Sequence, residues 1–476
     1  MKIKHLRKKV VFVLVILMAI LFLGYLHHYR KTTYYYKTDK DYQYDFSDSN
    51  AQVLIPEYRG NTLVIPESFD IENHSLFLKV ILKPSFLGNF LKPSVTVSCN
   101  NAHSVNQFEI GAKGSRYINL SGLNSAGCKQ IELLPQYTNL DFKGSQLYAF
   151  KDEKIEDKRI LVVGTHPDDA EIAAYGLYAN HKDTFVLTIT SGEAGPFVYD
   201  EIYADTVEHY LEKGKLRTWN SVTVPLLAGV EPDNILNLGF FDETLQSMYT
   251  NDTAKVMGIF TKTNDINTFR KFNTSKYKDS LTGSSNWNSL VSNLKYLIGA
   301  FKPDIIVAPY PLIDLHPDHK FTTIAVIEAL KGLDMHDGFL FLYTNHHTLS
   351  ESYPYGDTGE EVTLPPYFKN GLYFNSIFSN RVDEAILKEK ILAFDAMNDL
   401  RGDTEWRFPQ KEVSNFSRNM VMQTMGITKD YYRRAARSNE LFFIVDIKNI
   451  YNSEVYKKIT AGAFDNVPAV MSEISY

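Results

Sequence analysis

The sequence predicts an α/β protein in which a doubly wound, mostly parallel sheet is preceded by a small all-β, sandwich-like domain and an N-terminal transmembrane helix. Three patterns support this prediction. An uncharged apolar run follows a basic N-terminus, short segments divided by turn residues fill residues 31–150, and continuous apolar segments alternate with helix-period segments from residue 158 to residue 476. Strands that alternate with helices are typical of doubly wound α/β domains.

The first thirty residues predict a membrane anchor. Basic residues from Lys2 to Lys9 precede an uncharged run at 10–26, which would reach about 25 Å as a helix, close to the lower limit for a membrane span. No small-residue cleavage pattern follows Gly24, so the pattern favours an uncleaved signal anchor over a cleaved signal peptide. Because basic residues favour the cytoplasmic side, we expect a single-pass protein of the inner or plasma membrane whose remaining chain lies in the periplasm or at the cell surface.

Residues 31–150 predict an all-β accessory domain. Candidate strands cover residues 62–65, 75–82, 94–99, 107–110, 116–120 and 130–134. Several of them alternate apolar and polar residues, and Gly, Pro, Asn and Ser divide them at intervals typical of a β-sandwich. The two cysteines of the chain, Cys99 and Cys128, both fall here, and the sequence leaves open whether they form a disulfide or remain buried thiols.

The chain after residue 158 has the character of a layered α/β domain. Residues 160–163, 185–189 and 305–308 are continuous apolar runs, as expected of strands buried on both faces of a parallel sheet. A helix is predicted around Ile324, Ile327 and Leu330, with Gly332 placed to end it. The formal net charge of −6, without a stripe of Lys and Arg after the N-terminus, argues against a nucleic-acid partner.

Two His-Pro-Asp turns follow two of the predicted strands. One is His166-Pro167-Asp168-Asp169, directly after residues 160–163, and the other is His316-Pro317-Asp318-His319, shortly after residues 305–308. A single turn of this kind is usually no more than a helix N-terminus capped by its Asp. Two of them at the carboxyl ends of strands instead predict a ligand site, because such sheets bind ligands at that edge.

The side chains of these turns suit metal-assisted hydrolysis. Catalytic zinc commonly binds two histidines and one carboxylate and leaves a position for water. His166, Asp169 and His319 supply that set if the two strand ends are neighbours, although the same ligands could hold another divalent metal. We expect Asp168 to be the general base and His316 to stabilise the oxyanion. Asp318 would orient His316 or a metal-bound histidine.

The same residues carry a resemblance to a known family. HPDDAEIAAYG at residues 166–176 and HPDH at residues 316–319 resemble the two main motifs of the PIG-L/LmbE family of zinc-dependent N-acetylglucosaminyl deacetylases. Weaker matches are TSGEAG at residues 190–195, Arg217, and NLGFFD at residues 237–242. The resemblance implies a Rossmann-like fold over about residues 158–345 and the same metal and catalytic roles.

The weaker motif matches bear on substrate contacts. By resemblance, Glu193, Arg217 and Asp242 are candidate substrate-binding residues. The chain also departs from the family pattern. Ala173 and Tyr175 stand where the family often has Gly, and the segment around Arg217 lacks the usual Glu-rich continuation. These departures concern the substrate and leave the predicted metal ligands intact.

The function expected from these observations is removal of the N-acetyl group from N-acetylhexosamine units of an extracytoplasmic glycan or glycoconjugate. The partners would be that sugar or polysaccharide, the membrane, and polysaccharide-synthesis machinery. Two alternatives remain open: a deacylase of a small cytoplasmic amino-sugar conjugate, and a non-catalytic glycan-binding surface protein. The complete set of metal ligands and an adjacent base favours the enzyme.

Overall fold

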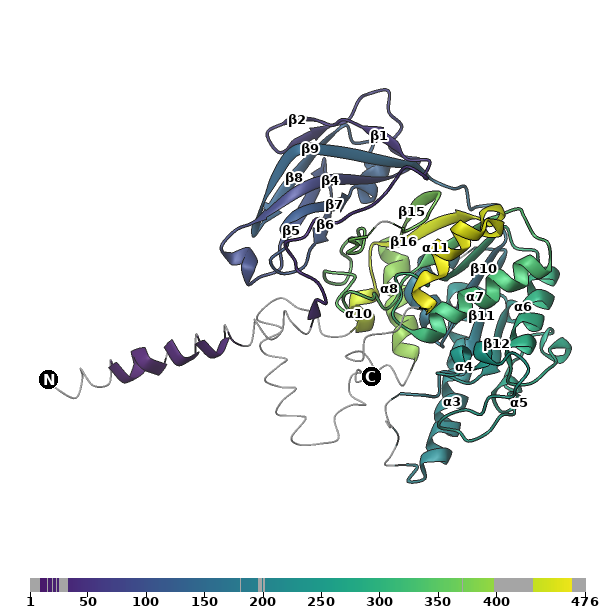
Figure 1. Cartoon of the computed structure of the whole chain (residues 1–476). Helices are drawn as coiled ribbons and strands as arrows, with labels where there is room; N and C mark the ends of the chain where they lie inside the picture. Colours follow the sequence, from purple (N-terminus) through teal and green to yellow (C-terminus); the bar gives the residue numbers. More distant parts are fainter. Residues whose placement is uncertain are drawn as a thin grey trace.

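The structure, a computed structural model, describes residues 33–464 except 180, 196–198, 200–201, 370 and 398–430, together with residues 9–14, 16–18, 20–22 and 24. Its strands form two antiparallel sheets of four and five strands near the N-terminus and one seven-stranded sheet after them. The two smaller sheets pack beside one end of the larger one (Figure 1).

Residues 52–151 form the two antiparallel sheets. The first has the order β1-β9-β4-β7 and the second the order β2-β3-β8-β5-β6. Their strands are β1 (Gln52–Leu54), β2 (Glu57–Arg59), β3 (Thr62–Val64), β4 (His74–Pro84), β5 (Ser94–Cys99), β6 (Ala102–Gln107), β7 (Gly114–Asn119), β8 (Gln130–Gln136) and β9 (Thr138–Lys151). Aliphatic side chains of both sheets form one core, and the disulfide Cys99–Cys128 closes a loop within it.

The larger sheet has the order β12-β11-β10-β13-β14-β16-β15. Its strands are β10 (Ile160–Gly164), β11 (Thr184–Thr190), β12 (Ile235–Phe240), β13 (Ile305–Pro309), β14 (Phe339–Tyr343), β15 (Ser376–Arg381) and β16 (Asn439–Asp446). The first five in spatial order run parallel, and β16 and β15 are antiparallel to their neighbours. β10 pairs with β13, with Ile160 opposite Ile305, so the two His-Pro-Asp turns leave adjacent strands.

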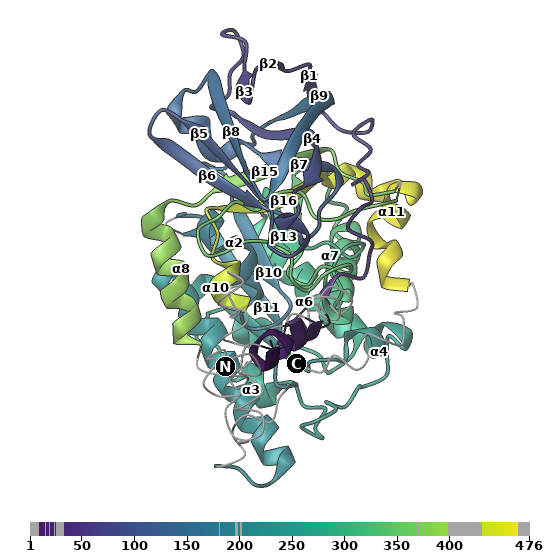
Figure 2. The ribbon, with the colours of Figure 1, turned by 90° about the vertical axis from the view of Figure 1, so that its left-hand side faces the viewer.

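Helices cover both faces of this sheet (Figures 1 and 2). They are α2 (Asp169–Tyr178), α3 (Thr206–Thr223), α4 (Leu245–Thr250), α5 (Asn267–Arg270), α6 (Trp287–Phe301), α7 (Pro317–Gly332), α8 (Glu384–Ala396), α10 (Tyr431–Ala435) and α11 (Ser453–Phe464). Along β10, Ile160 and Val162 pack toward α2 and α8, while Leu161 and Val163 pack toward α6 and α7. This two-sided burial explains the continuous apolar run in the sequence.

The predicted fold class is wrong in its sheet pattern. Of the thirteen strand pairings among the described residues, nine are antiparallel. Even the sheet that carries the two turns is mixed, because β15 and β16 extend its parallel part in the opposite direction. A mostly parallel, Rossmann-like sheet therefore does not describe this chain. The prediction missed the antiparallel edge because both added strands come from the C-terminal part of the chain, where no strand was predicted.

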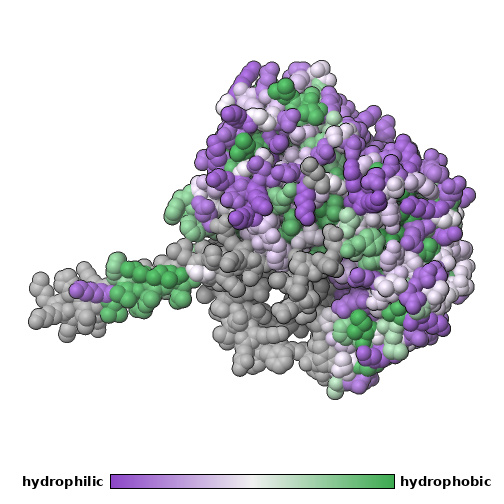
Figure 3. Space-filling view, viewed as in Figure 1, coloured by the Kyte–Doolittle hydropathy of each residue, from purple (hydrophilic) through white to green (hydrophobic). Residues whose placement is uncertain are grey.

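The predicted N-terminal transmembrane helix is also wrong, and with it the predicted single-pass location in a membrane. A spanning helix needs about 20 predominantly apolar residues. No helix in the described parts of the chain has the length and apolar composition to cross a membrane. Apolar side chains of residues 10–14, 16–18 and 20–22 are exposed on the segment that projects from the otherwise mostly hydrophilic surface in Figure 3.

Candidate functional site

The polar residues singled out in the sequence gather at the carboxyl edge of the parallel strands. His166 and Asp168 follow β10, Glu193 follows β11, Asp242 follows β12, and His316 follows β13. β14 adds Asn345 and His346 to the same edge. Open α/β sheets bind ligands at this edge. From β10 the chain continues to its neighbour β11, and from β13 it continues to β14 on the other side. The switch point of the sheet therefore lies between β10 and β13.

The first turn presents two carboxylates side by side. Asp168 is the N-cap of α2, and its backbone has a φ of 155°, a region that residues other than Gly rarely adopt. Asp169 begins the helix, and its Oδ2 accepts a hydrogen bond of 2.7 Å from the His166 amide. The other oxygen, Oδ1, accepts one of 2.7 Å from Asn345 Nδ2. Asp169 is therefore held on both sides, while the strained turn directs Asp168 elsewhere.

The second turn presents two imidazoles from the start of α7. His316 is the N-cap, and its Nδ1 accepts a hydrogen bond of 3.2 Å from the Asp318 amide. Because Nδ1 is an acceptor there, the neutral ring carries its proton on Nε2. Burial and the nearby His166 hold the pKa of His316 well below its usual value, which favours that neutral form. His319 lies in the first turn of the helix and is fully buried.

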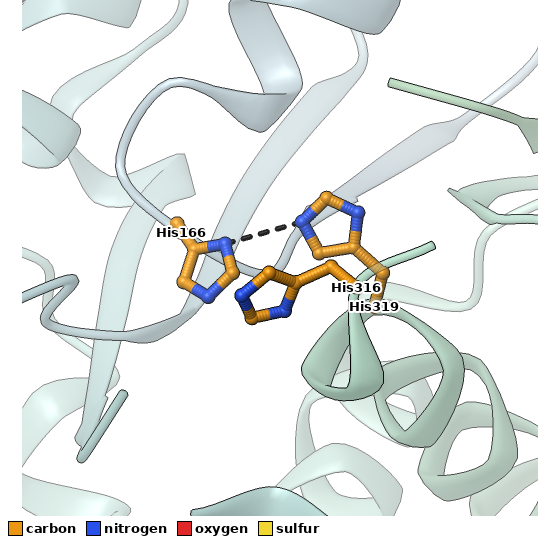
Figure 4. A group of neighbouring side chains, drawn as sticks. All are labelled: His166, His316 and His319. Carbon is orange, nitrogen blue, oxygen red and sulfur yellow. Dashed lines mark hydrogen bonds between the residues drawn. The ribbon is translucent and has the colours of Figure 1, made fainter. Parts of the chain in front are cut away.

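Three ligand atoms from the two turns meet in a small triangle. His166 Nδ1 lies 3.1 Å from His319 Nε2 (Figure 4). Asp169 Oδ2 lies 3.3 Å from the first of these nitrogens and 3.1 Å from the second. Zinc binds nitrogen and oxygen at about 2.0–2.1 Å, and a tetrahedral arrangement then separates the ligand atoms by about 3.3–3.4 Å. The triangle thus fits a divalent ion of that size with little movement.

Other groupings of ligand atoms overlap this triangle. The sets His166–His316–His319, Asp169–His319–His346 and His166–Asp242–Asp318 each have ligand atoms within 4.8 Å of one another. We favour the His166–Asp169–His319 set because all three of its contacts are 3.3 Å or shorter. In the third set, Asp242 Oδ1 lies 2.8 Å from His166 Nε2, a hydrogen-bond distance on the other nitrogen of that imidazole. This contact orients His166 from behind.

Asp314 holds His319 in the same way. Its Oδ1 lies 3.0 Å from His319 Nδ1, and both side chains are fully buried. Burial opposes ionisation of Asp314, but the charge and hydrogen bond of His319 outweigh it and lower its pKa to about 2. Burial lowers the pKa of His319, and Asp169 and Asp314 together raise it to about 10. A cation bound at Nε2 would displace the proton that Asp169 favours on that nitrogen, while Asp314 keeps its contact with Nδ1.

The predicted base, Asp168, directly precedes Asp169 of the triangle in the chain, and its Oδ2 accepts from two donors. Arg217 Nη2 lies 3.3 Å from Asp168 Oδ2 and donates to the Pro167 carbonyl at 3.1 Å. The hydroxyl of Tyr432, in α10, donates to the same Oδ2 at 3.2 Å. Gly192 makes room for Arg217, because a Cβ there would lie 2.5 Å from Pro167 Cδ and 2.8 Å from Arg217 Nε.

The other predicted residues lie around this centre. Asp318 accepts the Leu245 amide at 3.1 Å through Oδ1, and its Oδ2 is 3.9 Å from His166 Nε2, so its carboxylate faces His166 and only its amide contacts His316. Glu193 is fully buried behind Asp242, whose amide donates to it at 3.2 Å. Burial, then the charge of Asp242, raise the pKa of Glu193 to about 8. Of the three candidate substrate contacts, Arg217 therefore contacts the predicted base Asp168, and Asp242 contacts the predicted metal ligand His166. Glu193 accepts the Asp242 amide and so supports Asp242.

Sequence reasoning missed four residues of the site: Asp314, Asn345, His346 and Tyr432. Asp314 stands two residues before His316, and that spacing was the available signal. The ring of His346 lies 5.4 Å from that of His319, and it stacks on Tyr431. The sequence did not assign Asn345, His346 or Tyr432 to the site, because their places depend on β14 and α10 packing against the two turns.

Comparison with known proteins identifies the part of the chain that contains both turns. Residues 161–330 match the family model PIG-L, described as GlcNAc-PI de-N-acetylase. This region belongs to the PIG-L family. The resemblance expected from the motifs is thereby confirmed, and the PIG-L region covers β10 to α7 with all three atoms of the triangle. Comparison with curated protein sequences gives no match.

Solved structures similar to this chain each cover about 60% of it. The A40926 pseudoaglycone deacetylase Dbv21 is 16% identical with a TM-score of 0.32, and covers 61% of this chain and 98% of its own. A zinc-inhibited form of the teicoplanin deacetylase Orf2 is 14% identical with a TM-score of 0.33, covering 60% and 98%. The 4-carboxy-2-hydroxymuconate hydratase GalB of Pseudomonas putida KT2440 is 14% identical with a TM-score of 0.28, covering 60% and 95%. At such low scores, we base no conclusion about the PIG-L region on these proteins.

Proposed function

We propose that this protein is a zinc-dependent deacetylase that removes the acetyl group from N-acetylhexosamine units of a glycan or glycoconjugate. The observation that carries the proposal is the triangle of His166, Asp169 and His319, with Asp168 next to Asp169 in the same turn. The family description of the PIG-L region, GlcNAc-PI de-N-acetylase, supports an N-acetylated amino sugar as the substrate class.

Zinc is the ion we propose, because two imidazoles and one carboxylate form a common catalytic zinc site. When bound, such an ion polarises the amide carbonyl and lowers the pKa of water. The buried partners Asp314 and Asp242 hold the two imidazoles in place for it. The three side chains would leave the fourth coordination position of the ion open for water or substrate.

The side chains of the site divide the proton transfers. Asp168 takes a proton from the attacking water, whose oxygen forms a bond to the acetyl carbon. His316 donates from Nε2 to the oxygen that gains negative charge, since its Nδ1 is occupied by the Asp318 amide. The carbon–nitrogen bond then breaks, and the proton held by Asp168 passes to the departing nitrogen. The products are acetate and a free amino sugar.

The test is acetate release from short β-linked N-acetylglucosamine oligomers by the full chain, measured with and without a chelator. We expect release that stops with chelator and returns when zinc is added back. Asp168→Asn should lower kcat by at least 10²-fold while the zinc content stays at that of the native protein. Asp157→Asn, an exposed carboxylate before β10, should leave the rate unchanged.

Two results would contradict the proposal. A folded, zinc-loaded protein that releases no acetate from a panel of N-acetylated hexosamines would exclude this activity. Acetate release that persists after the metal has been removed and verified as absent would exclude the role of the triangle.

A further inference from the structure

We propose that Tyr432, which lies outside the PIG-L region, is a positioning residue for the catalytic base Asp168. This inference rests on the proposed function, because it assigns Tyr432 a role through that base. Residue 432 is about a hundred positions beyond the end of the family match at residue 330. The site would then depend on a C-terminal helix that the family match does not cover.

The contact lies on the carboxylate itself. The Tyr432 hydroxyl donates to Asp168 Oδ2 at 3.2 Å, and Arg217 Nη2 lies 3.3 Å from the same oxygen. Two donors on one oxygen resist rotation of the carboxylate about its Cβ–Cγ bond. The other oxygen, Oδ1, therefore keeps a constant direction, as proton transfer to a general base requires.

Asp168 has particular need of such support. Its backbone φ of 155° lies in a region that costs about 1–3 kcal/mol and persists only where the surroundings enforce it. Its side chain is nearly buried, and an ionised carboxylate in such a place needs donors. Arg217 approaches from α3, and Tyr432 from α10, so the carboxylate is held by elements outside its own turn.

The short helix α10 is itself firmly placed. The ring of Tyr431 stacks on His346 with centroids 5.5 Å apart and planes at 8°. Arg433 forms an ion pair with Asp395 at 2.7 Å, which ties α10 to residues of α8. Arg434 donates to the carbonyl of Ser352 at 3.0 Å. These contacts of three neighbouring residues support the position from which the Tyr432 hydroxyl reaches Asp168.

The first experiment compares Tyr432→Phe with the native full chain in kcat, KM, zinc content and melting temperature. The variant keeps the ring and removes the one hydroxyl, so we expect kcat to fall about tenfold. KM should change by less than about twofold, and zinc content should not change. Tyr451→Phe is the matched control: its hydroxyl donates to the Met335 carbonyl at 2.9 Å, beyond the far end of α7. It should leave kcat unchanged.

The second experiment asks whether Tyr432 acts through Asp168. In the Asp168→Asn background, Tyr432→Phe should lower kcat no further, because the group that Tyr432 positions has already been replaced. An equal loss of kcat in both backgrounds would overturn the proposal and make Tyr432 a residue with an independent role. The proposal would also be overturned if Tyr432→Phe lost kcat because it had lost zinc. The same holds if its melting temperature fell well below that of Tyr451→Phe.

A readout without turnover separates this inference from the proposed function. The melting temperatures of the native chain, both single variants and the double variant form a cycle that measures the Tyr432–Asp168 contact directly. We expect the two changes to be non-additive. Additive changes would overturn the inference even in an active enzyme. Absence of acetate release together with non-additive changes would reject the proposed function and retain the contact.

Discussion

The buried pair His319–Asp314 joins a predicted metal ligand to a carboxylate that no motif marked. Their contact, Nδ1 to Oδ1 at 3.0 Å, leaves His319 Nε2 directed at Asp169 Oδ2. A carboxylate behind a ligand imidazole fixes its orientation and raises its basicity. Since Asp314 also accepts the backbone amides of His316 and Asn345, at 3.1 Å each, it links the loops after β13 and β14 to the same imidazole.

Replacing this carboxylate should weaken the metal site. We expect Asp314→Asn to lower zinc affinity by about 10–100-fold, because the amide cannot supply the negative charge behind His319. Activity should recover at high zinc. Competition with a chromogenic chelator measures the affinity. The matched control is Asp334→Asn, which alters an exposed His–Asp pair with His336 at 3.0 Å. Equal affinities for Asp314→Asn and the native chain would contradict this role.

Arg217 allows a choice between two roles. If it holds Asp168, as the 3.3 Å contact indicates, Arg217→Met should lower kcat by about 10–100-fold and leave KM nearly unchanged. If it binds substrate, as the family motif suggested, KM should rise instead. Lys215→Met removes an exposed cation of the same helix, paired with Glu212, and serves as the control. Steady-state kinetics on both variants decide between the roles.

Gly192 should be intolerant of any side chain. Its φ is +61°, and an added Cβ would approach both Pro167 and Arg217 to less than 3 Å. We expect Gly192→Ala to destabilise the fold by about 1–3 kcal/mol and to lower activity further by moving Arg217 away from Asp168. Urea unfolding and kcat test the two effects. Gly144→Ala, at a φ of +68° with open space around it, is the control for the backbone cost alone.

The sequence predicted which side chains gather at the site better than it predicted the architecture around them. Both His-Pro-Asp turns were recognisable because their ligands are close in sequence and follow apolar runs. The two turns meet only if β10 and β13 are neighbouring strands, and in the structure these strands pair directly. The contributions of Asn345 and Tyr432 depend on contacts across 176 and 264 residues, and no local pattern encodes such contacts.

The strand predictions failed where local patterns were weak. Of the expected segments in residues 31–150, five coincide with strands β3, β4, β5, β7 and β8, and the sixth is displaced from β6. The longest strand, β9, was missed because it contains Asp141, Lys143 and Gly144, which resemble a turn. Its register shifts between Lys79 and Ile81 of β4, and this irregularity accommodates those residues within the sheet.

Glu361 gives a prediction about pH that is independent of the catalytic site. Its backbone pairs with Asn106 of β6, and its side chain is buried. Burial is the main influence and raises its pKa to about 7, from an ordinary carboxyl value of 4.5. Between these two pH values the unfolded chain releases a proton that the folded chain keeps. Stability contributed by this group is therefore complete below pH 4.5 and is lost as the pH rises to 7.

The neutral variant Glu361→Gln should remove this loss. We expect it to match the native free energy of unfolding at pH 4 and to exceed it by up to about 3 kcal/mol at pH 8, since each pKa unit corresponds to about 1.4 kcal/mol. Urea unfolding at pH 4, 6 and 8 measures the difference. Glu57→Gln, at an exposed position in β2, should give no such trend. If the difference in free energy of unfolding between Glu361→Gln and the native chain does not grow from pH 4 to pH 8, the prediction is wrong. The Glu361 carboxyl would then ionise as readily in the folded protein as in the unfolded one.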